Sequence, residues 1–239
     1  KEPAFEPGIW HGLENDARQA IGYDEILDCW EQGCSLLGSY RPQLISVHDP
    51  DEYLNSAISI QDRETKKSDI REAYRALHYL KDRGLVKGVG VGAKDWKIIH
   101  ELHREVELDW VMFANSLTIM NHPPELLSFI RALAQANVSI VNSAVFHGGF
   151  LTGGNFYDYK PVDEKEKQDK PLFEYRERFV RLCKQFEISP ALVCIQFGFR
   201  VPGVHSVALN TSRPERVKEN VAMGTARVPE TFWNDCLLY

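Results

Sequence analysis

Helix patterns and strand patterns alternate along most of this chain, and this alternation is the strongest constraint on its fold. From Ser68 to about Gly84, apolar residues recur at three- and four-residue spacing, which is typical of an amphipathic helix. The run from Leu85 to Gly92 follows directly, is rich in β-formers and ends in glycine. Repeats of such a unit with short turns indicate parallel strands with right-handed crossovers, and therefore an α/β fold.

The same patterns predict five strands and the helices around them. The strands are expected near Leu44, Val86, Trp110, Val138 and His205, and the strand near Trp110 is expected to span residues 110–114. The helices are expected at residues 23–37, from Ser68 to Gly84, and at residues 96–106, 123–136, 172–186, 190–199 and 213–223. We expect one parallel sheet in which these segments lie side by side: residues 44–47, 89–91, 111–113, 140–142 and 206–208.

Five strands cannot close a barrel built from eight strand–helix units, which needs about 250 residues or more. Two arrangements therefore remain open. Either the sheet is open and doubly wound, or an N-terminal portion of the fold lies upstream of Lys1. The chain does not begin with Met, and this favours the second arrangement.

Length and composition indicate one domain, spanning residues 1–239. With 44% apolar residues the chain can bury a sizeable core. The net charge of -6 is spread along the chain, and the densest charge run, residues 163–170, alternates in sign. Nucleic acids and anionic membranes select a basic stripe instead, so neither is an expected partner. Composition does not predict the oligomeric state.

Cysteine usage and hydropathy bear on the location of the protein. The five cysteines are scattered and show no Cys-x-x-Cys spacing, which favours reduced thiols over a disulfide framework or a zinc site. No apolar stretch approaches the roughly 20 residues that a membrane helix needs. We therefore expect a soluble protein of the cytoplasm.

The segment 47–51 (Val-His-Asp-Pro-Asp) ends the first predicted strand. His48 follows an apolar run, and Pro50 stops the strand. Side chains at the carboxyl ends of buried parallel strands project into the mouth of an α/β fold, which makes His48 the candidate catalytic residue. A histidine at this place can equally cap a loop by hydrogen bonding, so the motif alone leaves both roles open.

A second candidate site lies around the start of the last predicted helix. Its candidate phosphate- and adenine-binding residues are Asn210, Thr211, Ser212, Arg216, Glu219 and Asn220. Unpaired N–H groups and the positive end of the helix dipole favour phosphate there, and such a corner is the usual phosphate site of a β/α barrel. The alternative is an ordinary N-cap by Thr211 or Ser212, with Arg216 and Glu219 as a surface pair.

Four segments stand in the order and spacing of a known family, the aldo-keto reductases. They are residues 48–51 (His-Asp-Pro-Asp), 88–92 (Gly-Val-Gly-Val-Gly), 149–153 (Gly-Phe-Leu-Thr-Gly) and 213–220 (Arg-Pro-Glu-Arg-Val-Lys-Glu-Asn). From about Tyr23 to its C-terminus the chain resembles this family, and most of all its aldose 1-dehydrogenase branch, with the D-threo-aldose, L-fucose and L-galactose dehydrogenases. The resemblance implies a (β/α)8 TIM barrel, of which this chain would cover the third helix to the C-terminal helices, with five of the eight strands.

The resemblance also implies a chemistry. In aldo-keto reductases a Tyr exchanges a proton with the substrate oxygen, a Lys–Asp pair lowers its pKa, and a His orients the carbonyl. The Asp, Tyr and Lys are expected upstream of Lys1, so His48 alone is assigned here. The implied function is that of an NAD(P)-dependent oxidoreductase, which transfers hydride between NADP or NAD and an aldose C1 or a small carbonyl substrate.

At the nicotinamide end the chain departs from the family. Many relatives place a Gln near Ala114 to hold the carboxamide and an aromatic residue near Ser143 to stack on the ring, and neither is present. Asn115 offers an amide instead, and Phe146 offers a ring that is equally suited to the core. The expected cofactor-binding residues at these strand ends are Asn115, Ser143, Phe146 and Gly148.

Further features concern the phosphates. Many NADP-preferring relatives have a Lys where Asn210 stands, but Arg216 remains available, so both NADP and NAD stay open. A loop rich in glycine and charge runs from His147 to about Pro171, and we expect it to fold over the pyrophosphate. His147 itself is expected to bond loop backbone rather than phosphate.

Two other functions remain as alternatives. A metal-dependent barrel hydrolase or isomerase would use His48, Asp49 and Asp51 as ligands. The other predicted strand ends offer glycine, amide and hydroxyl groups, which are poor ligands, so no metal is expected. A non-catalytic subunit or fragment that keeps a nucleotide pocket is the second alternative, because three of the four catalytic groups are not assigned in this chain.

Overall fold

The computed structural model describes residues 19–236, and the chain divides into two compact units. The first unit ends at Val89, and the second begins at Gly90. Each unit has its own buried apolar residues. No helix in the described part of the chain is long and apolar enough to cross a membrane. A single barrel domain over residues 1–239 stays a prediction.

Within residues 19–89, helices pack around one strand and the start of another. The elements are α1 (Tyr23–Leu37), β1 (Leu44–His48), α2 (Pro50–Asn55), α3 (Ile60–Asp82) and the first residues of β2 (Gly88–Ala93). The backbone N–H groups of Lys87 and Gly88 donate to the carbonyl oxygen of Gln43, at 2.7 and 3.2 Å. β1 therefore lies next to the start of β2.

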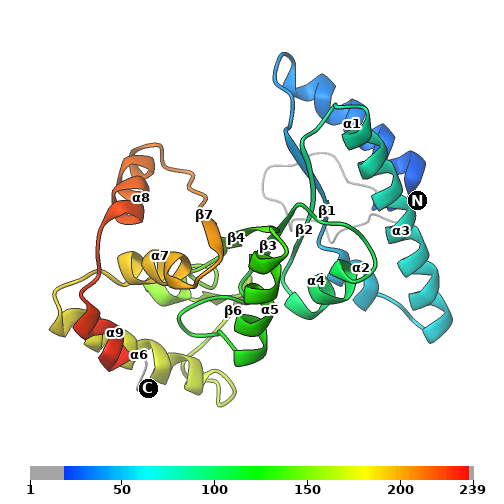
Figure 1. Cartoon of the computed structure of the whole chain (residues 1–239). Coiled ribbons are helices and arrows are strands. Elements are labelled where there is room, and N and C mark those ends of the chain that lie inside the picture. The colour runs from blue at the N-terminus through cyan, green and yellow to red at the C-terminus, as the bar shows by residue number, and fades with distance from the viewer. Residues whose placement is uncertain (1–18, 237–239) are drawn as a thin grey trace. The chain divides into compact units, whose positions relative to one another are not determined.

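Helix α3 supplies most of the core of the first unit. Its buried residues have the three- and four-residue spacing of an amphipathic helix: Ile70, Ala73, Tyr74, Ala76, Leu77 and Leu80. α1 packs along α3 (Figure 1). The rings of Tyr23 and Tyr79 lie 6.5 Å apart. Gly84 follows the helix with φ +68°, a left-handed conformation that favours glycine, so the predicted helix end is confirmed.

The start of α3 differs from the prediction. Ser68 was expected to cap the helix, but the helix begins at Ile60 and Ser68 lies inside it. The cap is Ser59, whose Oγ accepts the N–H of Asp62 at 3.0 Å, while Asp62 accepts the N–H of Ile58 at 3.0 Å. No residue of the extra turns is buried, so they carry no apolar stripe from which periodicity predicts a helix.

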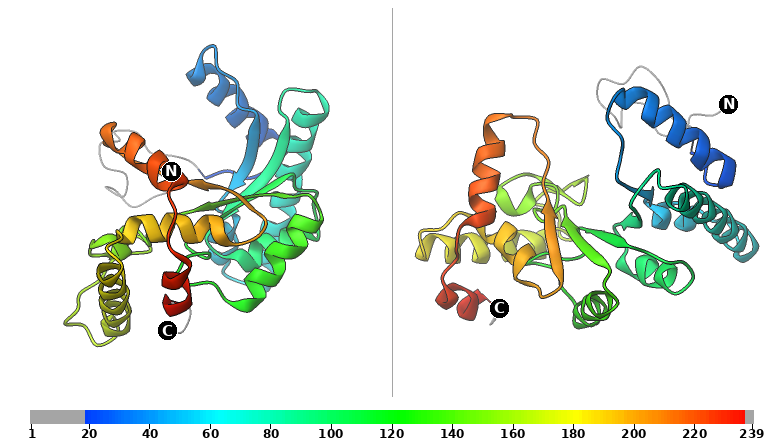
Figure 2. Two further views of the ribbon diagram at one scale, coloured as in Figure 1. Left: turned by 60° about the vertical axis from the view of Figure 1, so that its left-hand side comes forward. Right: turned by 45° about the horizontal axis from the view of Figure 1, so that its top comes forward.

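In the second unit, β2 joins further parallel strands. They are β3 (Trp110–Ala114), β4 (Ser139–Ser143) and β7 (Val204–Ala208), each paired in parallel with the strand before it. The helices are α4 (Trp96–His103), α5 (Pro124–Gln135), α6 (Lys170–Gln185), α7 (Pro190–Arg200), α8 (Glu215–Thr225) and α9 (Glu230–Cys236). Figure 2 shows β7, in orange, beside the green strands. The predicted parallel pairing is confirmed for β2, β3, β4 and β7.

The sheet of the second unit is covered by helices. Val91, Val111, Phe113 and Ile140 have no exposed surface, as expected of parallel strands buried on both faces. Helix α5 packs on β4, and α7 packs on β7. The middle residues of the strands therefore form part of the core, and polar residues lie at the strand ends.

The predicted bounds hold best where the hydrophobic period is strong. α1 and β3 agree with their predicted ranges residue for residue, and α5 differs from its prediction by one residue at each end. Two short helices, α2 and α9, were not predicted. α2 begins at Pro50, which was expected only to stop a strand; proline is favoured in the first turn of a helix because no partner is needed there for its missing N–H.

The segment predicted as a long loop contains regular structure. After the 3-10 turn η1 (Phe150–Thr152), strands β5 (Phe156–Tyr157) and β6 (Lys160–Pro161) pair antiparallel. Asp158 and Tyr159 connect them with φ values of 48° and 69°. Two successive positive φ values are typical of the tight turn of a hairpin. Residues 156–161 are called the β5–β6 hairpin below.

The pairing of Gly90 with Trp110 leads to a stability prediction. A Cβ at Gly90 would lie 2.3 Å from the indole ring and 2.5 Å from the carbonyl oxygen of Trp110. We expect Gly90→Ala to lower the free energy of unfolding by about 1–3 kcal/mol, because the backbone has no room to yield. Gly92→Ala is the matched control, since its Cβ would meet only the Cβ of Met112, at 3.7 Å. Equal urea midpoints for the two variants would contradict this account of the packing.

Candidate cofactor-binding site

The carboxyl ends of β3, β4 and β7 meet at one edge of the sheet. The register pairs Ala114 with Ser143, and Ser143 with Ala208. The loops that follow these strands therefore start side by side, and Asn115 comes next to Ser143, as the sequence predicts. This edge is the candidate site of the second unit, because α/β folds place ligands outside the carboxyl ends of their strands.

At this edge, Asn115 has a buried side-chain amide that makes no hydrogen bond to the described residues. It is only 5% exposed, its φ is 59°, and its backbone N–H donates to the carbonyl oxygen of Ser143 at 3.4 Å. Its side-chain Oδ1 and Nδ2 are both buried without a hydrogen-bond partner among the described residues. Because such a buried polar group costs about 1–3 kcal/mol when unpaired, the amide is suited to a ligand that offers both a donor and an acceptor.

The other residues predicted around the nicotinamide are less open to a ligand. The hydroxyl of Ser143 donates to the carbonyl oxygen of Phe113 at 3.1 Å. Phe146 is half-buried, which agrees with either a stacking or a core role. Gly148 has φ +68°, and a Cβ there would lie 3.3 Å from the carbonyl oxygen of Phe156. Because Gly148 has no Cβ and tolerates a positive φ, the backbone at this position can pass close to the β5–β6 hairpin.

The expectation that His147 bonds loop backbone is wrong. His147 is fully buried, and both ring nitrogens bond side chains. Nε2 lies 2.6 Å from Oγ1 of Thr118, and Nδ1 lies 2.6 Å from Oδ1 of Asp158. These partners lie 29 and 11 residues away in sequence, so no local pattern pointed to them.

The predicted phosphate corner is exposed. Asn210, Thr211, Ser212, Arg216 and Glu219 are exposed, and Asn220 is half-buried. The helix begins at Glu215 rather than Arg213, and no side chain caps it. The alternative of an N-cap by Thr211 or Ser212 is therefore wrong: Oγ1 of Thr211 accepts the N–H of Arg213 at 3.1 Å instead, before the helix starts.

His48 belongs to the first unit and ends β1, as predicted. Its side chain is 86% exposed, and Nε2 lies 3.9 Å from Oδ2 of Asp49. Asp49 has φ 44°, a left-handed conformation that turns the chain from β1 into α2. Among residues 19–236, no group of three or more His, Cys, Asp or Glu residues is placed to hold a metal ion, so the ligand set of the metal-dependent alternative is not assembled.

The cysteines of the second unit are poor nucleophiles; Cys183 and Cys194 are buried, and Cys236 is half-buried. Burial raises the pKa of the Cys183 thiol to about 12 and that of Cys236 to about 11. Burial also raises the pKa of Cys194 well above its usual value. Since the thiolate is the reactive form, these side chains are unreactive near neutral pH.

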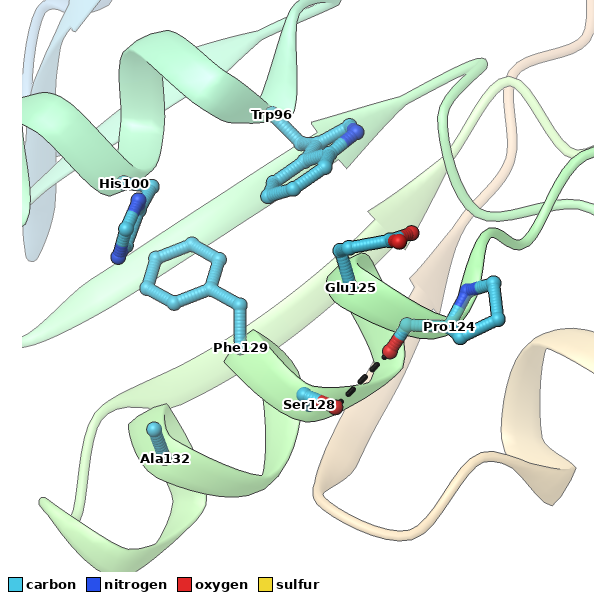
Figure 3. A pocket seen from close by; sticks show the side chains of 7 residues that line it. All are labelled: Trp96, His100, Pro124, Glu125, Ser128, Phe129 and Ala132. Carbon is cyan, nitrogen blue, oxygen red and sulfur yellow. Dashed lines mark hydrogen bonds between the residues drawn. The ribbon is translucent and has the colours of Figure 1, made fainter.

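A shallow hollow of about 560 Å³ lies between α4 and α5. Its lining residues are Trp96, His100, Pro124, Glu125, Ser128, Phe129 and Ala132 (Figure 3). The ring of His100 meets Phe129 edge-on at 4.7 Å, and the hydroxyl of Ser128 donates to the carbonyl oxygen of Pro124 at 2.9 Å. None of the predicted site residues lines it.

Comparison with known proteins identifies the family. The model of the aldo/keto reductase family matches residues 12–236. The chain belongs to the aldo/keto reductase family. Among curated relatives of this aldo/keto reductase, pyridoxal 4-dehydrogenase of Microbacterium luteolum is 23% identical over 94% of the chain, and D-threo-aldose 1-dehydrogenase of a Pseudomonas species is 25% identical over 82%. The chain spans 64% and 56% of their lengths.

Solved structures show the same fold. The holo form of an aldo-keto reductase from Bacillus halodurans superposes with a TM-score of 0.64 at 19% identity. The match covers 90% of this chain and 67% of the Bacillus halodurans chain. A mutant of the protein Gox0644, solved in complex with NADPH, superposes with a TM-score of 0.61 at 17% identity. The match covers 90% of this chain and 65% of the Gox0644 chain. The aldo/keto reductase chain is thus an α/β protein that covers part of the barrel of its family.

We expect Asn115→Gly to raise the free energy of unfolding, although it removes a side chain. The variant loses two buried, unpaired polar groups and tolerates positive φ without strain. Asn137→Gly is the matched control, because Asn137 has the same φ of 59° but is exposed. Urea unfolding should show Asn115→Gly to be more stabilising than Asn137→Gly by about 1 kcal/mol. A loss of stability at Asn115 would mean that its amide serves the fold.

Proposed function

We propose that the full protein is an NAD(P)-dependent oxidoreductase that transfers hydride between a nicotinamide cofactor and an aldose C1 or a small carbonyl compound. The observation that carries this proposal is the buried, unpaired amide of Asn115 at the carboxyl edge of a parallel sheet, in a member of the aldo/keto reductase family. Two curated relatives are named as dehydrogenases, of pyridoxal and of D-threo-aldose, and one structural neighbour is solved with NADPH.

The residues of the second unit suit the two ends of such a cofactor. Asn115 offers an acceptor and a donor, which match the N–H and C=O groups of the nicotinamide carboxamide. The ring of Phe146 provides an apolar face beside it. At the other end, the exposed segment Asn210-Thr211-Ser212 and the uncapped start of α8 offer backbone N–H groups and a positive dipole for phosphate. When bound, the nicotinamide supplies the hydride or accepts it.

His48, in the first unit, carries a separate part of the proposal, which concerns the chemical step. A ring N–H of this imidazole donates to the substrate oxygen and orients the carbonyl, while the proton-exchanging group comes from elsewhere in the full protein. The substrate is a carbonyl compound or the cyclic form of a sugar, since both present an oxygen on the reacting carbon. A small-molecule partner and a location in the cytoplasm are part of the same proposal.

A nucleotide titration tests the cofactor site. Asn115→Gly should weaken NAD and NADP alike by roughly tenfold, because both carry the carboxamide that loses its partners. Arg216→Ala should weaken NADP more than NAD, by about 1–3 kcal/mol, if the 2′-phosphate pairs with the guanidinium. Arg227→Ala is the control, since Arg227 is exposed but lies beyond α8. Equal losses for both nucleotides in Arg216→Ala would place Arg216 at the adenine instead, and no loss would remove it from the site.

The catalytic role of His48 has its own test. His48→Ala should lower kcat of the full protein by roughly 10²–10⁴-fold, the scale expected for a lost acid–base or polarising group. His100→Ala serves as the control, because His100 is an exposed histidine on α4 outside the proposed site. Turnover that is unchanged in His48→Ala would exclude His48 from the chemical step and would favour the loop-capping role. Nucleotide binding without any turnover in the wild type would favour the non-catalytic alternative.

A further inference from the structure

We propose that Thr118, His147 and Asp158 form a latch around the buried ring of His147, which holds the β5–β6 hairpin at the carboxyl edge of the sheet and slows the release of the nucleotide. The first part of this inference concerns the fold of the second unit alone. The second part rests on the proposed function.

The three side chains form one continuous hydrogen-bonded chain. A carboxylate only accepts, so His147 carries a proton on Nδ1 and donates it to Oδ1 of Asp158, at 2.6 Å. Oγ1 of Thr118 accepts the N–H of Asn121 at 3.0 Å, and its hydroxyl proton is directed at Nε2 of His147, at 2.6 Å. Every polar atom of the imidazole is thus paired, as a fully buried ring requires.

Neighbouring aromatic rings also restrict the orientation of the His147 imidazole. The ring of Tyr157 stacks on His147 at 4.6 Å with an interplanar angle of 10°, and Phe150 meets Tyr157 edge-on at 5.6 Å. Burial raises the pKa of Tyr157 to about 12, with the Asp158 carboxylate as a second cause, so the phenol stays neutral beside that carboxylate. The left-handed Gly148 lets the backbone approach Phe156 closely on the other side.

The latch joins the hairpin to the loops that leave several strands. His147 follows β4, and Thr118 lies in the loop that begins with Asn115 after β3. Lys94, directly after β2, places its Nζ 5.2 Å from the centre of the Tyr159 ring. The hydroxyl of Ser116 donates to the carbonyl oxygen of Lys94 at 2.8 Å, which connects the β2 and β3 ends. The hairpin is therefore tied to the edge at which the unpaired amide of Asn115 lies.

The hairpin needs such a tie because it is too small to be stable alone. Each of its strands has two residues, and an isolated two-stranded hairpin is at best marginally stable in water. Asp158 lies at its tip, in the turn, where one hydrogen bond restrains both strands at once. Removal of that bond therefore frees the hairpin while leaving the sheet intact.

Two substitutions of Asp158 separate the effect of its hydrogen bond from the effect of the turn conformation. Asp158→Gly removes the acceptor, and glycine tolerates the φ of 48°. Asp158→Asn is the rescue variant, because its side-chain oxygen still accepts from Nδ1 and asparagine also tolerates this conformation. Hydrogen exchange of the backbone amides in residues 156–161 is measured first, in the full protein without nucleotide. Release of NADPH is then followed by stopped-flow fluorescence.

The latch predicts that exchange in the hairpin accelerates roughly tenfold in Asp158→Gly and returns toward the wild-type rate in Asp158→Asn. NADPH release should accelerate about 3- to 10-fold in the glycine variant only. Exchange that is equal in all three proteins overturns the latch. Faster exchange with unchanged release overturns its effect on the nucleotide. If the wild type binds no nucleotide, the proposed function and the second part of the inference fail together, and the exchange rates alone decide the latch.

Discussion

Parallel pairing of β3 with β4 is the constraint on which the site depends. The hydrogen bonds of this pair set Ala114 opposite Ser143, and the N–H of Asn115 continues the pattern to the carbonyl oxygen of Ser143. In a parallel pair both strands must end at the same edge, so the loops that carry polar residues start together. A shift of the register by one residue would turn the buried residues of the strand toward the opposite face. The apolar core and the polar edge are thus two results of one alignment.

Buried polar side chains in the second unit differ in how many of their polar atoms have a hydrogen-bond partner. Both ring nitrogens of His147 are paired, and Nδ2 of Asn142 donates to the carbonyl oxygen of Leu117 at 2.8 Å. Asn115 differs because neither polar atom of its amide has a partner among the described residues. Its left-handed backbone adds a conformational cost. The unpaired amide at a strand end is therefore the observation on which the proposed cofactor site depends.

Membership of the aldo/keto reductase family and the local departures from its pattern fit together. The chain has a parallel sheet, a histidine that ends β1 and an exposed corner before α8. It carries its amide at Asn115, and its loop after β4 holds a hairpin fixed by His147. A shared fold leaves loops free to vary, and the departures of this chain lie in such loop segments.

Local patterns in the sequence determined the helix–strand alternation, the parallel class of the sheet, the bounds of α1 and β3, and the family. They did so because hydrophobic period and turn chemistry act over a few residues. They missed the first turns of α3, in which no residue is buried and no apolar period is present, and the short α2 and α9. Only the tertiary structure decided that His147 pairs with Thr118 and Asp158, that the amide of Asn115 is left unpaired, and that no side chain caps α8. Such facts depend on groups far apart in the chain, whose contacts form only when the strands pair and exclude water.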